Sequence, residues 1–356
     1  GIRDSALKWI ASYFDCRKQQ VLIDGVRSKE DVLTCNVPQG SVLGPKFFID
    51  YESPLGDIIR SHGLEAHFYA DDTQIYLAFK PNTSKHPNLE SDALTKLQSC
   101  IADVRAWMAS NFLKVNDDKT ELLVLGTPQQ LAKVSIDSVE VGNCTIDCSS
   151  QVRNIGAIFD QNLKMDKQVS TCKSAWYKIH QIGKIRPYLN IEESKSVINS
   201  FVTSKLDQNN SLLLGVADEQ ISRLQKIQNA SAKIICQKKK YDHVTPLLKD
   251  LHWLPVKHRI TFKVLLFTYK ALNGEAPSYL SDMLQKHTTK DGNRSGDDPL
   301  LLHIPRTKNL YGDAAFSVGA PRLWNDLPLS IGSSASTAIF KKNLKTYLFK
   351  QYFGAC

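Results

Sequence analysis

The sequence FYADDTQIY, residues 68–76, is the most informative stretch of this 356-residue chain. Apolar and polar residues alternate on both sides of Asp71 and Asp72, which predicts a β-hairpin with two carboxylates at its tip. A turn lets both side chains lean toward one side, whereas a straight strand directs neighbours to opposite faces. Adjacent aspartates at a turn are more often an Asx turn than a metal site, so this stretch alone assigns no function.

Two further motifs flank the hairpin. Upstream, residues 38–41 read PQGS, in which the glycine lets backbone approach a nucleotide closely and Ser41 can cap a following helix. We expect that helix to run from Ser41 to about His62 and to pack beneath the hairpin. Downstream, the sequence from residue 113 to Lys119 reads as a basic turn before a strand. The sequence Asp-Tyr-Glu at residues 50–52 is unusual, and we assign it no role.

The rest of the first 160 residues mixes helix and strand patterns. Apolar spacing predicts helices over residues 4–15 and 94–108, and residues 20–37 predict a strand pair that turns near Asp24 and Gly25. Further strand candidates are ELLVLG (121–126), KVSIDSVEVG (133–142) and VRNIGAIFD (152–160). We therefore expect an α+β fold with antiparallel pieces up to residue 160.

Beyond residue 160 the apolar residues recur at helical intervals, which predicts a mostly helical region. Trp176 and Trp324 are candidates for its core, and the sequence HWLP at residues 252–255 is best explained as packing at a helix boundary. Residues 288–299 contain DGNRSGDDP and read as a linker before a C-terminal segment rich in aromatic and basic residues.

Charge also divides the chain. Residues 1–160 hold 16 Lys and Arg against 21 Asp and Glu, whereas residues 161–356 hold 29 against 15. A basic half beside an acidic half suits a polyanion-binding module next to a carboxylate-rich site. A solvated basic surface explains the charge equally well, and charge alone does not separate nucleic acid from an anionic membrane surface.

Other protein classes find no support in the sequence. It has no apolar run near the roughly 20 residues of a membrane span and no signal-peptide pattern. Its eight cysteines and nine histidines form no zinc-binding motif, so we expect reduced thiols and no zinc. We expect no membrane partner and an intracellular location, in nucleus or cytoplasm, with no targeting signal to choose between them.

Taken in order, NVPQGSVLGP, FYADDTQIY, KTELLVLG and VRNIGAIFD resemble the palm of reverse transcriptases. The fuller text is similar to that of non-LTR, LINE-type retrotransposons of the jockey and chicken-repeat kind. The resemblance continues through HVTPLLKDLHWLPVKHRI and YGDAAFSVGAPRLWNDLP and covers essentially the whole chain. It implies an RNA-directed DNA polymerase that uses a two-metal mechanism with Mg²⁺ or Mn²⁺, and an RNA template and a DNA primer as partners.

The resemblance also implies a division of the chain. Residues 1–160 would form a partial right-hand palm, an antiparallel sheet with helices that carries motifs B to E. Residues 161–287 would form a helical thumb or connection, residues 288–299 a linker, and residues 300–356 a C-terminal basic and aromatic segment.

Family roles can be assigned to matching positions in the front of the chain. Asp71 would be the metal-ligand aspartate, with Asp72 as a neighbour of lesser duty, and Tyr69 would lie beside the primer end. Gln39 and Gly40 would face the incoming nucleotide and the template.

Three further groups of positions also receive roles from the resemblance. Lys119 would help to neutralise the leaving pyrophosphate, and Ile155 and Gly156 would lie in the primer-grip hairpin. Lysines of the following helices would contact the nucleic-acid backbone: Lys164, Lys167, Lys173 and Lys178.

These polymerases also use an aspartate from an earlier palm strand, in a phrase like AFDxVDH that this sequence lacks. Asp4, Asp15, Asp24 and Asp31 are not set in that phrase. We therefore expect a fragment that descends from a polymerase and is catalytically incomplete. Two alternatives stay open: a non-catalytic nucleic-acid-binding or assembly remnant, and an unexpressed relic that never folds stably.

Overall fold

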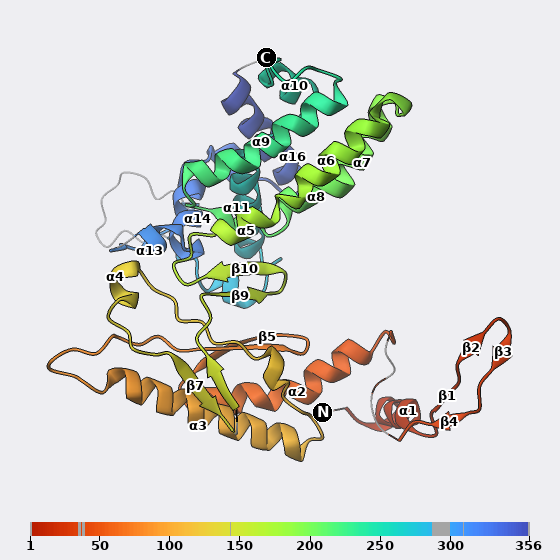
Figure 1. Cartoon of the computed structure of the whole chain (residues 1–356), viewed down its shortest axis with the longest axis vertical. Coiled ribbons are helices and arrows are strands. Elements are labelled where there is room, and N and C mark those ends of the chain that lie inside the picture. Colours follow the sequence, from red (N-terminus) through yellow and green to blue (C-terminus); the bar gives the residue numbers. More distant parts are fainter. Residues whose placement is uncertain are drawn as a thin grey trace. The chain divides into compact units, whose positions relative to one another are not determined.

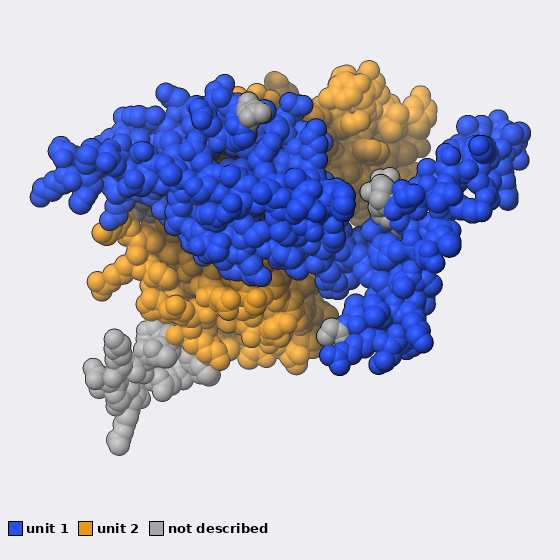
Figure 2. Space-filling view, turned by 90° about the horizontal axis from the view of Figure 1, so that it is seen from below, with its two compact units in different colours: residues 1–122, 129–148 blue, residues 123–128, 149–356 orange. Residues whose placement is uncertain are grey.

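The computed structural model describes residues 2–34, 37, 40–142, 144–286, 300–308 and 310–354. Its elements run from α1 to α16 along the chain (Figure 1). Two compact units are present: residues 1–122 and 129–148 form unit 1, and residues 123–128 and 149–356 form unit 2 (Figure 2). The division expected at residue 160, between a palm and a thumb, stays a prediction. The expected linker at 288–299 lies outside the described residues.

Unit 1 combines helices with short strand pairs, which agrees with the α+β class expected from the sequence. Its helices are α1 (Asp4–Phe14), α2 (Gly44–Ser61) and α3 (Leu89–Ser110), with α4 (Pro128–Leu131) where the chain returns from unit 2. Its strands are β1 (Lys18–Gln19), β2 (Leu22–Ile23), β3 (Val26–Arg27), β4 (Asp31–Val32), β5 (Glu65–Tyr69), β6 (Asp72–Tyr76), β7 (Ser138–Val141) and β8 (Cys144–Asp147). The pairs are β1–β4, β2–β3, β5–β6 and β7–β8, and all are antiparallel.

The beginning of unit 1 follows the sequence prediction closely. Helix α1 spans the predicted residues, and the turn between β2 and β3 lies at Asp24 and Gly25, where φ is +47° and +83°. Two consecutive residues with positive φ form the turn that best matches the twist of paired strands, and glycine adopts this conformation without steric cost.

Helix α2 begins at Gly44, three residues later than expected. The N-cap is Leu43, without a side-chain cap hydrogen bond, so the prediction that Ser41 caps the helix is wrong; the N–H of Gly44 nevertheless donates a hydrogen bond of 3.1 Å to Ser41 Oγ. Pro54 lies inside the helix and cannot donate to the carbonyl of Asp50. The Ser53 hydroxyl donates to that carbonyl at 2.9 Å instead, so the helix continues through the proline.

The core of unit 1 is built on α3, which buries two faces. One face packs against α2 and the β5–β6 hairpin, in a cluster of Leu55, Ile59, Leu64, Cys100 and Val104 with Ala66 and Ile75 at its edge. The other face packs against β7 and β8, in a cluster of Val139, Val141 and Ile146 with Leu94, Leu97 and Ile101 at its edge. The hairpin therefore rests on a helical floor formed by α2 and α3, as the sequence predicted for α2.

Unit 2 begins with one strand pair, β9 (Gln151–Asn154) with β10 (Ala157–Asp160), and is helical afterwards. Its longer helices are α6 (Ser174–Ile185), α7 (Ile191–Ile198), α9 (Asp218–Ile235), α11 (Val256–Leu272), α14 (Phe316–Asn325) and α16 (Thr337–Phe353). Its shorter helices are α5 (Asp166–Thr171), α8 (Ser204–Asp207), α10 (Thr245–Asp250), α12 (Ser278–Ser281), α13 (Leu310–Ala314) and α15 (Leu329–Gly332). A π-helical segment, Asn199–Thr203, joins α7 to α8.

Two apolar clusters hold unit 2 together. The larger one joins α5 to α11, and α6, α7 and α9 lie side by side in it (Figure 1). The smaller one joins α11, α14, α15 and α16, where the rings of Tyr269 and Phe340 stack at 4.2 Å between centroids. Trp253 and Leu254 are 9% and 5% exposed, which confirms that HWLP serves packing.

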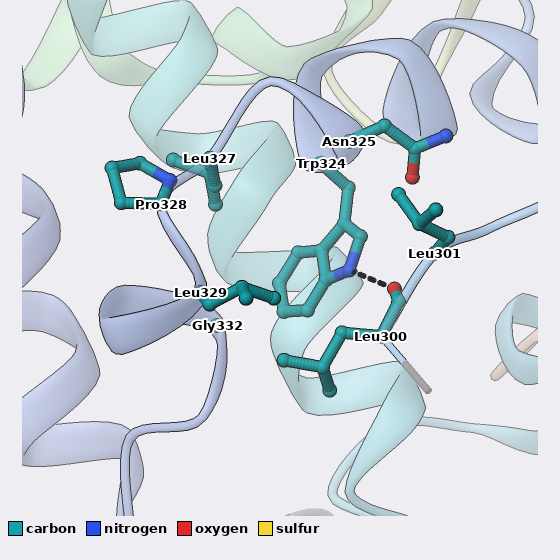
Figure 3. Close-up of a pocket in the computed structure, with 8 residues that line it drawn as sticks. All are labelled: Leu300, Leu301, Trp324, Asn325, Leu327, Pro328, Leu329 and Gly332. Carbon is teal, nitrogen blue, oxygen red and sulfur yellow. Dashed lines mark hydrogen bonds between the residues drawn. The ribbon is translucent and has the colours of Figure 1, made fainter. Parts of the chain in front are cut away.

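Trp324 confirms its assignment to the core. It is 4% exposed, and its indole N–H donates a hydrogen bond of 2.8 Å to the carbonyl of Leu300 (Figure 3). The small pocket beside this ring is lined mainly by leucine and proline side chains. Its composition and size suit packing and not a ligand.

Two sequence predictions are wrong. Trp176 is 44% exposed, because α6 buries the face of Ala175, Ile179 and Ile182, and Trp176 lies about 100° round the helix from Ala175. ELLVLG forms no strand: only Leu122 bridges, to Cys148, and residues 123–128 belong to unit 2. The run leaves unit 1 after Leu122, so no strand of either unit pairs along its length.

Candidate active site

The two aspartates lie at the tip of an antiparallel hairpin, which confirms the prediction. Strands β5 and β6 pair in register from Glu65 opposite Tyr76 to Tyr69 opposite Asp72. The turn consists of two residues, Ala70 and Asp71. Asp71 therefore projects from the turn itself, and Asp72 is the first residue of the returning strand.

The turn holds an unusual backbone conformation. Ala70 has φ +53°, in the left-handed region that residues with a Cβ seldom adopt. Such strained positions persist where the surrounding structure imposes them, and they concentrate at functional sites. The side chains of Tyr69, Asp71 and Asp72 are all exposed, and neither aspartate forms an ion pair within the described residues. Their oxygens are open to a ligand.

The strand register separates the two faces of the hairpin. Ala66 and Ile75 face the core of unit 1. On the opposite face, the rings of His67 and Tyr76 stack at 5.3 Å, and the Tyr76 hydroxyl lies 3.4 Å from Nε2 of His67. This outward face ends at Tyr69, which is 63% exposed and pairs with Asp72.

The PQG motif leads into the helix beneath the hairpin. Gly40 has φ +82°, and among the described residues no atom beyond Gly40 and its chain neighbours lies within 4 Å of the place where a Cβ would stand. Glycine is favoured at this position by the left-handed backbone conformation and not by a neighbouring atom that would clash with a side chain. Gln39 lies outside the described residues, so its predicted role stays a prediction. The Tyr13 hydroxyl donates to Ser41 Oγ at 2.7 Å and ties this loop to α1.

The sequence assigned no role to Glu52, a buried acid of α2 whose pKa is affected by the charge of Asp71. Glu52 of α2 is only 6% exposed, and burial raises its pKa to about 7, with the negative charge of Asp71 adding to the effect. The signal for this residue was in the sequence: Glu52 shares the spacing of Leu55 and Ile59, so an acid stands on the apolar stripe of the helix.

Lys119 lies on a separate element, a 3₁₀ turn formed by Asp117–Lys119 after α3. The turn is anchored by Asp117, which pairs with the guanidinium of Arg105, including an Nη2 to Oδ2 contact of 3.3 Å. Hydrogen bonding to Arg105 lowers the pKa of Asp117. Lys119 itself is exposed and joins none of the ion pairs among the described residues, so its ammonium group is available.

In unit 2, Ile155 and Gly156 form the turn of the β9–β10 hairpin. Their φ values are +44° and +78°, which again gives two positive values in a two-residue turn. A Cβ on Gly156 would lie 3.2 Å from Nε2 of Gln208, so a larger residue would displace that side chain. Ile155 is 46% exposed and offers an apolar tip.

The four predicted backbone-binding lysines come next in unit 2. Lys164, Lys167 and Lys173 are exposed, Lys178 is half-buried, and none of them forms an ion pair within the described part of unit 2. The ammonium of Lys178 lies 5.9 Å and 5.7 Å from the ring centroids of Tyr177 and Phe201. Both rings are at least half exposed, so a cation and two aromatic faces are presented together.

Two further features of the described residues concern metal ions and membranes. No set of three or more His, Cys, Asp and Glu side chains there is arranged to hold a metal ion. None of the described helices combines the length and the apolar character needed to cross a membrane.

Comparison with known proteins agrees with the hairpin and its surroundings. Residues 2–159 match the reverse transcriptase (RNA-dependent DNA polymerase) family. This part of the chain is therefore similar to the reverse transcriptases, a family that generally uses divalent metal ions and binds an RNA template and a primer.

A relative of this chain is the probable RNA-directed DNA polymerase from transposon BS of Drosophila melanogaster. The identity is 25% over 263 residues, which cover 71% of this chain and so extend beyond residues 2–159. The predicted resemblance to retrotransposon reverse transcriptases is thereby confirmed. The chain spans 28% of the length of this relative.

Proposed function

We propose that this chain supplies the second catalytic carboxylate motif and the nucleic-acid-binding part of a LINE-type retrotransposon polymerase that copies RNA into DNA. The observation that carries the proposal is the tight β5–β6 hairpin, which exposes Asp71 and Asp72 at a strained turn within the segment that matches the reverse transcriptases. In this proposal, unit 1 contributes a partial palm, and the helices of unit 2 contribute the thumb.

The donor atoms at the hairpin suit Mg²⁺ or Mn²⁺, because exposed carboxylate oxygens are the hard ligands that these ions prefer. Bound there, the ions would activate the attacking 3′-hydroxyl and stabilise the leaving pyrophosphate. Asp71 would be the principal protein ligand, and Asp72 would support it. Tyr69 would contact the primer end, and the open backbone at Gly40, with Gln39, would face the nucleotide and the template.

Other residues would hold the substrates in place. The exposed ammonium of Lys119 would neutralise charge on the leaving pyrophosphate. Ile155 and Gly156 would contact the primer, and the four lysines would contact phosphates independently of sequence. We also propose that the polypeptide of residues 1–356 alone is catalytically incomplete, since it contains no phrase like AFDxVDH.

Primer extension tests this proposal. A chimera would carry the fingers and first palm strand of a related reverse transcriptase in front of residues 1–356. It should extend a DNA primer on RNA with Mg²⁺, and Asp71→Ala should reduce the rate by at least about 100-fold. Asp72→Ala should cost less.

Residues 1–356 alone should extend no more primer than their Asp71→Ala variant. Extension by the wild-type chain alone, abolished by Asp71→Ala, would contradict the proposed incompleteness. An active chimera that Asp71→Ala leaves unchanged would contradict the assignment of the hairpin.

The second candidate function, a nucleic-acid-binding remnant without catalysis, is favoured by the free lysines and exposed rings of unit 2. Extension by the chimera would exclude it for this sequence. Binding of primer–template by a chimera that never extends a primer would support it.

A further inference from the structure

Two aromatic rings and two lysines lie together on the surface of unit 2, where α6 packs against the π-helical segment and α8. Tyr177 of α6 is 62% exposed, and Phe201 of the π-helical segment is 50% exposed. The ammonium group of Lys178 lies 5.9 Å and 5.7 Å from the centroids of these two rings. Lys205 of α8 reaches across to α6 and donates a hydrogen bond of 2.9 Å to Ser174 Oγ, one helical turn before Lys178. We call Tyr177, Lys178, Phe201 and Lys205 the aromatic–lysine strip.

The fold holds both rings of this strip outward. Helix α6 buries Ile179, and the π-helical segment buries Val202, so the chain beside each ring is anchored in the larger core cluster of unit 2. Tyr177 lies about 200° round the helix from Ile179, and Phe201 directly precedes Val202, so neither ring can share the buried stripe. Short π-helical turns are rare and occur frequently at functional sites. The two rings are therefore displayed on a rigid support without serving the core.

The lysines of the strip keep their charge free for an anion. Neither Lys178 nor Lys205 takes part in an ion pair among the residues that the structure describes in unit 2. The acid of α8, Asp207, is already paired with the guanidinium of Arg259, whose Nε lies 2.8 Å from its Oδ1. The strip thus presents two positive charges beside two aromatic faces.

This combination matches the two parts of a nucleotide. An ammonium group attracts a phosphate, and an aromatic ring stacks on the face of a base. In a duplex the base faces are covered by neighbouring base pairs, so rings on a protein surface meet them only where the strand is unpaired. The basic balance of residues 161–356, with 29 Lys and Arg against 15 Asp and Glu, favours a polyanion over an uncharged partner.

We propose that the aromatic–lysine strip binds single-stranded RNA, with unpaired bases stacked on Tyr177 and Phe201 and phosphates beside Lys178 and Lys205. The inference rests on the proposed nucleic-acid binding by unit 2, and it specifies the form that binds at this place: a strand with free base faces and not a duplex. Every base has an aromatic face, so this binding is independent of sequence.

The probe is a labelled, unstructured oligouridylate, and its affinity for the full chain is measured by fluorescence anisotropy as salt rises. A blunt RNA–DNA duplex of the same length is measured in parallel. The double variant Tyr177→Leu/Phe201→Leu keeps apolar side chains and removes both aromatic faces. It should bind the single strand about tenfold or more weakly, with an unchanged salt slope because no charge is lost, and bind the duplex within about twofold of the wild type.

Three further variants serve as controls. Tyr177→Phe/Phe201→Tyr keeps both rings and should bind the single strand as the wild type does. Tyr188→Leu removes a ring that is 86% exposed and has no lysine or ring against it among the described residues, and the affinity should stay within about twofold. Lys178→Gln/Lys205→Gln should lower the salt slope for the single strand by about 0.7 for each lost phosphate contact.

Two outcomes would overturn the inference, and they differ in what else fails. Equal weakening of single-strand and duplex binding by the leucine variant would show that the rings do not meet unpaired bases. Wild-type affinity in the leucine variant, together with a reduced slope in the lysine variant, would remove the stacking and leave the proposed phosphate contacts of unit 2 intact. Absence of salt-dependent binding of either probe by the wild-type chain would contradict the proposed nucleic-acid binding as well.

Discussion

Unit 1 and unit 2 differ in how they are packed. In unit 1 the described core consists of two small clusters on either face of α3, and the hairpin that carries Asp71 rests on one of them. In unit 2 a cluster that runs from α5 to α11 and a second around α16 contain many more buried apolar residues. Apolar burial is the main source of stability.

The residues that could take part in catalysis or binding differ between the units in the same way. Unit 1 exposes carboxylates on a strained turn and buries an acid with a raised pKa, features that cost stability. Unit 2 presents lysines on the outside of a well-packed helical body, a feature that costs little. We therefore expect the proposed chemistry to depend on unit 1 and most of the structural stability to come from unit 2.

The largest expected effect on stability comes from shortening one buried leucine in the core of each unit. Leu224 of α9 and Leu55 of α2 are both 1% exposed, and each Leu→Ala change should cost about 2–5 kcal/mol of local stability. Hydrogen exchange should quicken in α6, α9 and α11 for Leu224→Ala, and in the β5–β6 hairpin for Leu55→Ala. Leu329→Ala, at an exposed position, serves as the control. Equal loss of protection in both units from either change would show a single cooperative body.

The next effect is a pH dependence of stability that Glu52 should cause in unit 1. The folded pKa of Glu52 lies near 7, above its ordinary 4.5. Above pH 4.5 the unfolded state releases the proton while the folded state keeps it, so this residue lowers stability progressively up to about pH 7 and fully beyond. In EDTA, Glu52→Gln should therefore gain little at pH 5 and most at pH 8, with a difference on the order of 3 kcal/mol. A gain that is the same at both pH values would contradict the buried state of this acid.

A smaller effect is expected from the hydrogen bonds that Arg186 donates at the C-terminus of α9 in unit 2. Arg186 donates to the carbonyls of Ile234 and Ile235 at the C-terminus of α9 and to that of Leu189, at distances from 2.6 to 3.2 Å. Arg186→Ala should cost about 2 kcal/mol in chemical denaturation, because three carbonyls lose a charged donor. Arg186→Lys should recover little, since an ammonium group cannot reproduce the planar fork. Full recovery by lysine would mean that charge alone matters.

Much of this structure could be predicted from the sequence, and the successes share a cause. The β5–β6 hairpin, the turn at Asp24 and Gly25, and helix α3 are set by local patterns of alternation, turn residues and apolar spacing. Such patterns need no knowledge of the partner elements. The candidate site was predictable for the same reason, because Tyr69, Asp71 and Asp72 are neighbours in one hairpin.

The errors arose where tertiary partners decide the outcome. ELLVLG has strand composition, but it leaves unit 1 after Leu122 and meets no strand edge. Trp176 fits a helical repeat, but the buried stripe of α6 is the neighbouring one. The raised pKa of Glu52 comes first from burial and second from the charge of Asp71, and nothing in the local sequence joins a helix residue to that turn. The helical spacing of Glu52 with Leu55 and Ile59 could have indicated its burial, but the sequence analysis assigned it no role.

The division between the two units is tested most directly by binding of a labelled RNA–DNA primer–template to the full chain, followed by fluorescence anisotropy as salt rises. Two variants each lose four lysines to glutamine. One carries the changes at Lys164, Lys167, Lys173 and Lys178 of unit 2. The charge-matched control carries them at exposed positions of unit 1, Lys8, Lys29, Lys80 and Lys85.

We predict that the unit 2 variant binds weakly and that its slope of log affinity against log salt falls by about 0.9 for each lost phosphate contact. The unit 1 variant and Asp71→Asn should bind within about twofold of the wild type, because their changes lie outside the proposed backbone contacts. Unchanged binding by the unit 2 variant, or an equal loss in the unit 1 variant or Asp71→Asn, would contradict the separation of chemistry from nucleic-acid binding.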